Sequence, residues 1–207
     1  MELPNKKYQI IYADPAWKYN DEKGNDPALG GITYPTMSNE ELCALPIKNM
    51  ADKDCILLMW VTMPKLEECF QVINAWGFRY ITCAFVWIKK NPSGNGIYSG
   101  LGHWVNGNAE LCLLAKKGTP KRLDKSVKQI IMSPLREHSR KPDETYGRIQ
   151  RLFGDIPRIE LFARNRRQGW DVWGNEAPNF TQLSLPSADG DIIAVSEKTA
   201  ITDNDLK

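Results

Sequence analysis

The stretch Tyr8-Gln-Ile-Ile-Tyr-Ala-Asp-Pro-Ala-Trp17 begins as a largely apolar run and stops at an acidic residue followed by proline. A short apolar run bounded in this way predicts a buried β-strand with Asp14 at its carboxyl end. In open α/β sheets, ligands bind in the crevice beyond the carboxyl ends of the strands. Asp14 is therefore the first candidate for a functional residue.

The rest of the chain alternates in part between similar apolar runs and helical patterns. Further strands are predicted over residues 54–62, 80–88, 109–115, 127–132, 158–163 and 170–174. Helices are predicted after the capping box Ser38–Glu41, from Pro64 to Gly77 and from Pro142 to Gly154. This pattern predicts an α/β sandwich with a mainly parallel sheet flanked by helices.

The length and composition of the chain indicate one domain with a tail. A chain of 207 residues, 42% of them hydrophobic, is large enough to bury a core. After about Phe180 the sequence turns polar and acidic. We predict a folded domain over residues 1–179 and a flexible tail over residues 180–207.

Charge and cysteine usage restrict the class of protein. The net charge of +2 is too small to mark a nucleic-acid-binding protein, so any basic surface must come from local clusters. Five cysteines without a C-x-x-C pair, and two histidines, predict no metal site. No apolar stretch approaches the ~20 residues of a membrane span, and the N-terminus does not resemble a signal peptide. We therefore expect an intracellular protein that does not enter a membrane.

The tetrapeptide Asp14-Pro15-Ala16-Trp17 suits one specific chemical problem. An adenine amino nitrogen is a poor nucleophile because its lone pair is delocalised into the ring. The Asp14 carboxylate and the rigid Pro15 carbonyl could together accept its two N–H bonds and favour the tetrahedral nitrogen that develops during attack. Trp17 offers a face on which a base can stack. Asp-Pro is also common turn chemistry, so these residues alone leave a simple strand-end turn open.

Further motifs follow the tetrapeptide in order along the chain. They are Tyr34-Pro-Thr-Met-Ser38, Leu58-Met-Trp-Val-Thr62, Ala75-Trp-Gly-Phe78, Val86-Trp-Ile-Lys89, Gly102-His-Trp104, Glu110-Leu-Cys112, Lys141-Pro-Asp-Glu144, Glu160-Leu-Phe-Ala-Arg164 and Trp173-Gly-Asn-Glu176. Through these motifs the chain resembles the MT-A-seventy family of S-adenosylmethionine-dependent adenine N(6)-methyltransferases, in its bacterial and phage type. The resemblance implies a Rossmann-like methyltransferase fold in which the catalytic motif precedes the cofactor-binding segment. One departure is Ala16, where the family usually has a second proline.

The resemblance also implies a set of site residues. The catalytic motif supplies Asp14, Pro15 and Trp17, and the cofactor S-adenosylmethionine is expected to contact Asp14, Lys141, Arg164, Asn175 and Glu176. A lysine suits the carboxylate of the methionine end, and side chains with fixed donors and acceptors suit the ribose hydroxyls and the adenine. Without the resemblance, surface charge and a turn would be the favoured explanations of these residues.

Substrate contacts are expected from Trp17 of the catalytic motif and from residues that follow the motif in the sequence. By resemblance, Tyr34 and Glu110 line the target-base site, and Trp104 is expected near it with Trp17. Local basic clusters include Lys116, Lys121, Arg122 and Arg140, which are candidate phosphate contacts. A solvated charged surface is the alternative role for these basic residues, and a salt-bridged strand position is the alternative for Glu110.

The resemblance leaves the polymer and the assembly open. DNA is the expected substrate, because the compact chain looks like the bacterial and phage members. RNA, and a catalytically idle nucleic-acid-binding partner subunit, are the alternatives. The chain could act alone, as a homodimer or with a partner subunit. Its expected location is the cytoplasm of a bacterium or of a phage-infected host.

Overall fold

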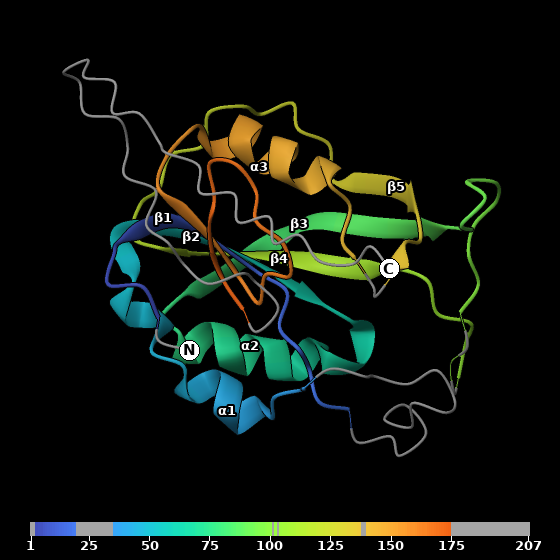
Figure 1. Ribbon diagram of the computed structural model, residues 1–207, viewed down its shortest axis with the longest axis horizontal. Coiled ribbons are helices and arrows are strands. Elements are labelled where there is room, and N and C mark those ends of the chain that lie inside the picture. The colour runs from blue at the N-terminus through green and yellow to red at the C-terminus, as the bar shows by residue number, and fades with distance from the viewer. Residues whose placement is uncertain (1–2, 20–34, 101, 103, 138–139, 175–207) are drawn as a thin grey trace, which may run out of the picture.

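A mixed sheet forms the centre of the computed structural model, which describes residues 3–19, 35–100, 102, 104–137 and 140–174 (Figure 1). Its strands are β1 (Tyr8–Ala13), β2 (Ala51–Val61), β3 (Arg79–Lys90), β4 (Glu110–Lys117), β5 (Ile130–Pro134), β6 (Arg158–Leu161) and β7 (Asp171–Trp173). They form a seven-stranded sheet in the order β5-β3-β4-β2-β1-β6-β7. β1 lies between β2 and β6 and is parallel to both, so its carboxyl end falls in the middle of the sheet edge.

β4 is the exception to the parallel arrangement of the described strands. It runs antiparallel to both β2 and β3, whereas β3 is parallel to β5 and β6 is parallel to β7. Consequently the amino end of β4, which begins at Glu110, lies at the same sheet edge as the carboxyl ends of the other strands. The prediction of a mainly parallel sheet is confirmed, with this one reversal.

Helices cover both faces of the sheet (Figure 1). The first helix, α1 (Asn39–Ala44), packs with α2 (Leu66–Ala75) on one face, and α3 (Glu144–Phe153) lies on the other. Two short 3-10 turns, η2 (Ile47–Asn49) and η3 (Met63–Lys65), precede β2 and α2. The predicted α/β sandwich with flanking helices is confirmed.

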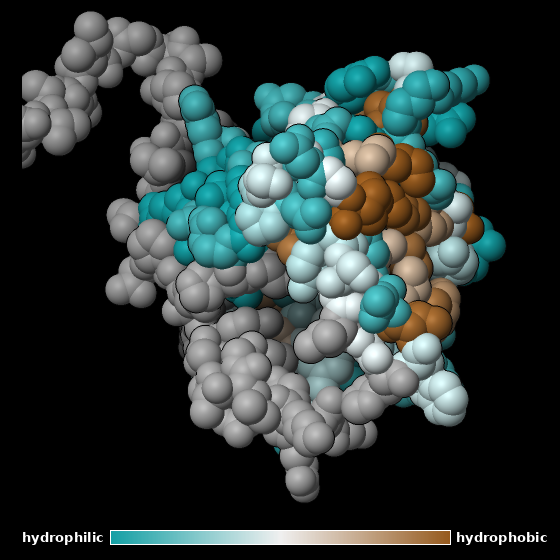
Figure 2. Space-filling view, turned by 90° about the vertical axis from the view of Figure 1, so that its right-hand side faces the viewer, coloured by the Kyte–Doolittle hydropathy of each residue, from teal (hydrophilic) through white to brown (hydrophobic). Residues whose placement is uncertain are grey.

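The central strand β2 is apolar from Cys55 to Val61 because both of its sides are buried there. In β2, Leu57 and Met59 belong to the core beneath α1 and α2. The intervening Leu58 and Trp60 belong to the core beneath α3. The outer strands are less well covered: Ile130 and Met132 of β5 are 47% and 55% exposed. Figure 2 shows exposed hydrophobic side chains gathered on one side of the molecule.

Local sequence signals set most of the helix ends. Ser38 caps α1 as predicted, since its hydroxyl accepts from the Glu41 N–H while the Glu41 carboxylate accepts from the Ser38 N–H. Gly77 and Gly154 follow α2 and α3 with φ of 82° and 88°, a left-handed conformation that favours glycine.

Some predicted boundaries were shifted by a few residues. Helix α3 begins at Glu144 rather than at Pro142, and β5 begins at Ile130 rather than at Val127. The proposed domain boundary at residues 179–180 lies outside the described residues. In the part of the chain that the structure describes, no helix combines the length and the apolar character needed to cross a membrane.

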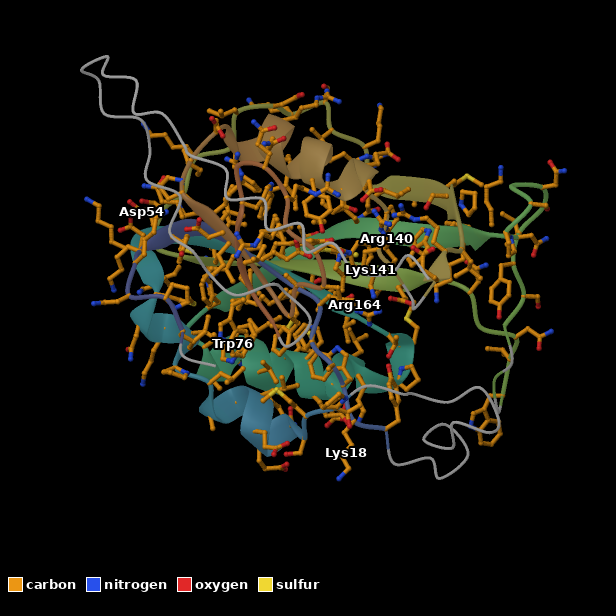
Figure 3. All side chains as sticks on the ribbon, in the orientation of Figure 1. Lys18, Asp54, Trp76, Arg140, Lys141 and Arg164 are labelled. Carbon is orange, nitrogen blue, oxygen red and sulfur yellow. The ribbon has the colours of Figure 1, made fainter. Side chains whose placement is uncertain are left out.

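The two helices on the α2 side are joined by one buried hydrogen bond. The indole N–H of Trp76 donates to the Leu42 carbonyl over 2.7 Å (Figure 3). We predict that Trp76→Phe lowers the free energy of unfolding by about 2–4 kcal/mol, because it leaves a buried carbonyl unpaired and opens a small cavity. Urea unfolding measures this. The control is Trp104→Phe at a position that is 97% exposed, where we expect no change in the free energy of unfolding. Equal losses for the two variants would contradict the stabilising role of the buried Trp76 side chain.

Candidate active site at the carboxyl end of β1

A cavity of about 150 Å³ opens beyond the carboxyl end of β1. Its wall combines the residues after β1, the ends of β2 and β6, and the first residue of β4. It is lined by Asp14, Pro15, Ala16, Trp17, Tyr19, Pro35, Met37, Trp60, Val61, Thr62, Glu110, Lys141, Phe162, Ala163, Arg164, Trp173 and Gly174. This is the sheet edge at which the sequence predicted a ligand site.

Asp14 reaches into this cavity with one of its carboxylate oxygens engaged. Its Oδ2 accepts a hydrogen bond from the Lys141 ammonium over 2.8 Å, and the side chain is 30% exposed. Its Oδ1 accepts no hydrogen bond from the residues that the structure describes. Asp14 can therefore offer one oriented oxygen to a ligand N–H group.

Asp14 is the end of a chain of alternating charges. Lys141 also binds Glu110 over 3.1 Å, and Glu110 in turn binds the Lys89 ammonium over 2.6 Å. The side chains of Lys89, Glu110 and Lys141 are only 17%, 5% and 10% exposed. Paired charges of this kind keep their ionised forms although they are removed from water.

The environment moves the pKa values of these groups in different directions. Burial raises the pKa of Asp14 above its ordinary value, and the adjacent Lys141 opposes this shift. Burial alone would raise the pKa of Glu110 too, but Lys141 and Lys89 hold it below its usual value. Burial would lower the pKa of Lys141, yet the carboxylates of Asp14 and Glu110 raise it. The arrangement thus fixes a permanent positive charge between two carboxylates.

Pro15 and Trp17 form a rigid wall beside Asp14. The Pro15 carbonyl accepts the Trp17 N–H over 2.9 Å, which leaves one of its two lone pairs for a ligand. Trp17 is only 6% exposed, and its indole N–H donates to the Trp60 carbonyl over 3.3 Å. Trp17 therefore lines the cavity with little exposed surface, which is less than the open stacking face that the sequence suggested.

The ends of β6 and β7 approach each other closely at the opposite wall. The Ala163 N–H donates to the Trp173 carbonyl over 3.0 Å. A Cβ atom on Gly174 would lie 2.4 Å from the Ala163 carbonyl oxygen, so only glycine fits there. Phe162 lines the cavity with φ of 61°, an uncommon left-handed conformation for a residue with a side chain. Backbone rather than side chains thus forms part of this wall.

The structure brings together seven of the eleven predicted site residues that it describes. Six of them line the cavity: Asp14, Pro15, Trp17, Glu110, Lys141 and Arg164. Arg140 lines an adjoining cavity, and Figure 3 shows it near Lys141 and Arg164. Tyr34, Asn175 and Glu176 lie outside the described residues.

Four predicted substrate contacts are not brought to the cavity. Trp104 is 97% exposed in the segment between β3 and β4. Lys116 lies near the carboxyl end of β4, and Lys121 and Arg122 follow that strand. Because β4 is antiparallel, Lys116 pairs with Ile56 of β2, away from the edge that carries Asp14. The reversal of β4 that brings Glu110 to the site is what carries these basic residues away from it.

Sequence reasoning missed Lys89 and Glu160. Lys89 is near the carboxyl end of β3, so its position after a buried strand was a usable signal once β3 was placed at the same edge. Glu160 is a charged residue inside a buried strand. It belongs to the motif Glu160-Leu-Phe-Ala-Arg164, from which the sequence analysis predicted only Arg164 as a site residue. Tyr146 of α3 donates to both Glu160 oxygens over 2.9 and 3.0 Å.

A mainly parallel sheet with a cavity beyond the carboxyl end of its central strand is the arrangement of an α/β protein that binds a ligand at this edge. Comparison with known proteins specifies the family. Residues 8–176 match the MT-A70 family model. The chain belongs to the MT-A70 family of adenine N6-methyltransferases, which use S-adenosylmethionine.

Individual relatives differ in how much of their length is shared. The chain is 35% identical over 207 residues to the type II methyltransferase M.MunI of a Mycoplasma species, covering 90% of this chain and 84% of that protein. It is 32% identical over 192 residues to the human N(6)-adenosine-methyltransferase catalytic subunit METTL3, and the match covers 91% of this chain and 30% of that protein. A Drosophila melanogaster MT-A70-like N(6)-adenosine-methyltransferase is 30% identical over 213 residues, and the match covers 97% of this chain and 33% of that protein. The chain therefore spans about a third of these eukaryotic relatives.

The charge chain has a pH-dependent consequence for stability. We predict that Lys141→Met lowers the free energy of unfolding by about 3 kcal/mol near pH 8, because two poorly solvated carboxylates lose their shared cation. Glu110 keeps its ion pair with Lys89, so Asp14 is the carboxylate that loses its cation. The loss of stability should therefore shrink towards about pH 5, where Asp14 can take up a proton. Urea unfolding at both pH values measures it.

Lys116→Met provides the matched control, because it makes the same change of side chain at the end of β4 that lies away from Glu110 and Asp14. Its effect should be small at both pH values. An equal loss for Lys141→Met at both pH values would show that packing, not charge, explains the effect.

Proposed function

We propose that this protein transfers a methyl group from S-adenosylmethionine to the N6 nitrogen of adenine in DNA. The observation that carries the proposal is the acceptor pair at the cavity wall. Asp14 has Oδ1 available while Lys141 holds Oδ2, and the neighbouring Pro15 carbonyl retains a lone pair. Two acceptors side by side suit an NH₂ group better than a hydroxyl or a ring nitrogen.

The acceptor pair addresses the weak nucleophilicity of the amino nitrogen. Hydrogen bonds from both N–H groups, to Asp14 and to the Pro15 carbonyl, favour a pyramidal nitrogen whose lone pair points out of the ring plane. That lone pair forms the new N–C bond to the methyl carbon while the C–S bond breaks, and its electron pair stays on sulfur. The nitrogen then loses one proton, for which Asp14 Oδ1 is the nearest acceptor.

Lys141 acts on this chemistry through Asp14. Burial raises the Asp14 pKa, which would favour the protonated form that cannot accept an N–H. The Lys141 ammonium at 2.8 Å opposes that shift and fixes the orientation of the carboxylate. Glu110 and Lys89 hold Lys141 from the other side, so the three residues act as positioning groups.

The cavity fits the cofactor in its donor set. Arg164 and the polar backbone at Gly174 lie on the β6–β7 side, and Asp14 is shared with the reacting centre. The absence of room for a side chain at Gly174 indicates a wall on which a flat group can lie against backbone. Asn175 and Glu176 directly follow this position in the sequence. When bound, the cofactor supplies an electrophilic methyl group on a positively charged sulfur.

Two observations support a polymeric DNA substrate. The similarity to the type II methyltransferase extends over 84% of that protein, whereas it extends over 30% of the human adenosine methyltransferase. The Asp14 carboxylate is recessed, so a target adenine in a duplex would have to leave the stack to reach it. Arg140 beside the opening is a candidate contact for the flanking phosphates.

The direct test is methyl transfer from labelled S-adenosylmethionine to matched DNA and RNA oligonucleotides. We expect labelling of adenine in DNA by the unaltered protein. Asp14→Asn should lower the rate by at least about 100-fold, because the variant replaces an oriented anionic acceptor with a neutral amide. Asp54→Asn is the control, since Asp54 lies at the far end of the sheet from Lys141 (Figure 3).

Each outcome of this assay has a defined meaning. Transfer to RNA but not to DNA would overturn the choice of polymer and retain the chemistry. Cofactor binding without transfer to either polymer would indicate the idle partner-subunit alternative. Full activity of the Asp14→Asn protein would exclude the proposed role of the acceptor pair.

A further inference from the structure

The segment between β4 and β5, residues 118–129, carries a local excess of positive charge. It contains Lys121, Arg122, Lys125 and Lys128 but only one acidic residue, Asp124. The whole chain has a net charge of +2, so the rest of the chain carries no surplus of positive charge. All four cationic side chains are exposed. We refer to residues 118–129 as the basic segment.

Ion pairing separates the basic segment from the cations near the cavity. Three arginines of the segment before α3 and of the loop after β6 share Asp143 as a partner. Among the residues that the structure describes, by contrast, none forms an ion pair with the four cations of the basic segment. Their positive charge is therefore available to a ligand.

The one acid of the basic segment does not neutralise it. Arg151 of α3 binds Asp124 over 2.7 Å. Hydrogen bonds from the hydroxyl and the N–H of Ser126, together with the one from Arg151, lower the pKa of Asp124 to about 2. Asp124 is thus ionised at neutral pH, and its charge is balanced by a helix residue rather than by the lysines beside it in the sequence.

Helix α3 holds the backbone of the basic segment in place. The Leu123 N–H donates to the Leu152 carbonyl over 2.7 Å. The Arg148 guanidinium donates to the carbonyls of Lys128 and Ile130. Figure 1 shows the segment passing over α3 on its way from β4 to β5. Because the backbone is held in this way, little further ordering is needed when the exposed cations bind a ligand.

The same helix connects the basic segment to the mouth of the proposed active site. At its amino end, Asp143 and Tyr146 line the cavity that adjoins the first one, and so does Arg140. From Asp143 to Leu152 an α-helix rises about 14 Å. This length corresponds to about four base pairs of a DNA duplex. DNA that leaves the cavity along α3 therefore reaches the basic segment within a few base pairs of the target base.

We propose that the basic segment binds the phosphates of the DNA that flanks the target adenine on one side, with this flank running along α3. The inference rests on the proposed function and adds a contact surface outside the cavity. Exposed cations without partners suit a polyanion, because each phosphate that they neutralise releases a counterion. Such contacts position the duplex and carry no sequence information. They also explain how a chain with a net charge of only +2 can hold DNA.

The first test measures DNA binding by the full chain. The variant combines Lys121→Gln, Lys125→Gln and Lys128→Gln, and the probe is a fluorescent duplex of mixed sequence with about 30 base pairs, followed by anisotropy at several salt concentrations. We expect roughly 10-fold weaker binding near physiological salt. The slope of log affinity against log salt should become less steep by about one for each phosphate contact that is lost.

A matched variant removes the same number of lysines elsewhere. It combines Lys7→Gln, Lys48→Gln and Lys53→Gln, all at exposed positions. Lys7 and Lys53 lie close enough to Asp52 to lower the pKa of that carboxyl group, so acidic charge is near them. We expect its DNA affinity to stay within about twofold of the unaltered protein and its salt dependence to be unchanged.

Methyl transfer then locates the contact along the DNA. The adenine that the transfer assay labels is placed in two duplexes of equal length, with about 3 base pairs on one side and about 15 on the other, in opposite orders. We expect the Lys121–Lys125–Lys128 variant to raise KM roughly 10-fold for one duplex and by less than about twofold for the other, because α3 lies on one side of the cavity. An unchanged kcat would show that the variant is folded.

The outcomes separate this inference from the proposed function. Unchanged affinity and salt dependence in the Lys121–Lys125–Lys128 variant would show that these lysines are only a solvated surface, and the proposed function would stand. Equal losses for the two triple variants would attribute the effect to net charge and overturn the inference. Equal increases in KM for the two duplexes would overturn the path along α3. If the unaltered protein binds DNA through these lysines but labels no adenine in it, the proposed function fails and the basic segment remains a DNA contact.

Discussion

The ammonium of Lys141 is the interaction on which the rest of this site depends. It binds the carboxylates of Asp14 and Glu110 over 2.8 and 3.1 Å, and the side chains of Lys141 and Glu110 have little contact with water. Three segments that are far apart in the sequence meet at this one nitrogen. Because a buried carboxylate without a cation is strongly unfavourable, the pairing couples the position of β1 to those of β4 and the amino end of α3.

The reversal of β4 makes this meeting possible. In an all-parallel sheet, the amino end of that strand would lie at the edge opposite Asp14. Its antiparallel pairing with β2 places Leu111 opposite Val61, and so brings Glu110 to the carboxyl edge of β1. The same reversal takes Lys116 to the other edge. A single change of strand direction therefore decides which charged residues of β4 lie at the cavity.

Two adjoining cavities share the Asp14–Lys141 wall, and their linings differ in chemistry. The first is bounded by the acceptor pair, aromatic residues and the close approach of β6 and β7. The second is bounded by charged residues of both signs, which come from β6, from the loop after it and from the segment before α3.

The sequence by itself determined most of the helices and strands and the family to which the chain belongs. Apolar runs such as residues 8–13 and the capping box at Ser38 encode local structure through burial and hydrogen bonding between near neighbours, so both were predictable. The ordered motifs identified the family and pointed to Asp14, Glu110, Lys141 and Arg164. Only the tertiary structure decided the direction of β4, the burial of Trp17 and the pairing of Glu160 with Tyr146. These depend on contacts between residues distant in the chain, whose geometry is set by sheet pairing and helix packing rather than by any local pattern.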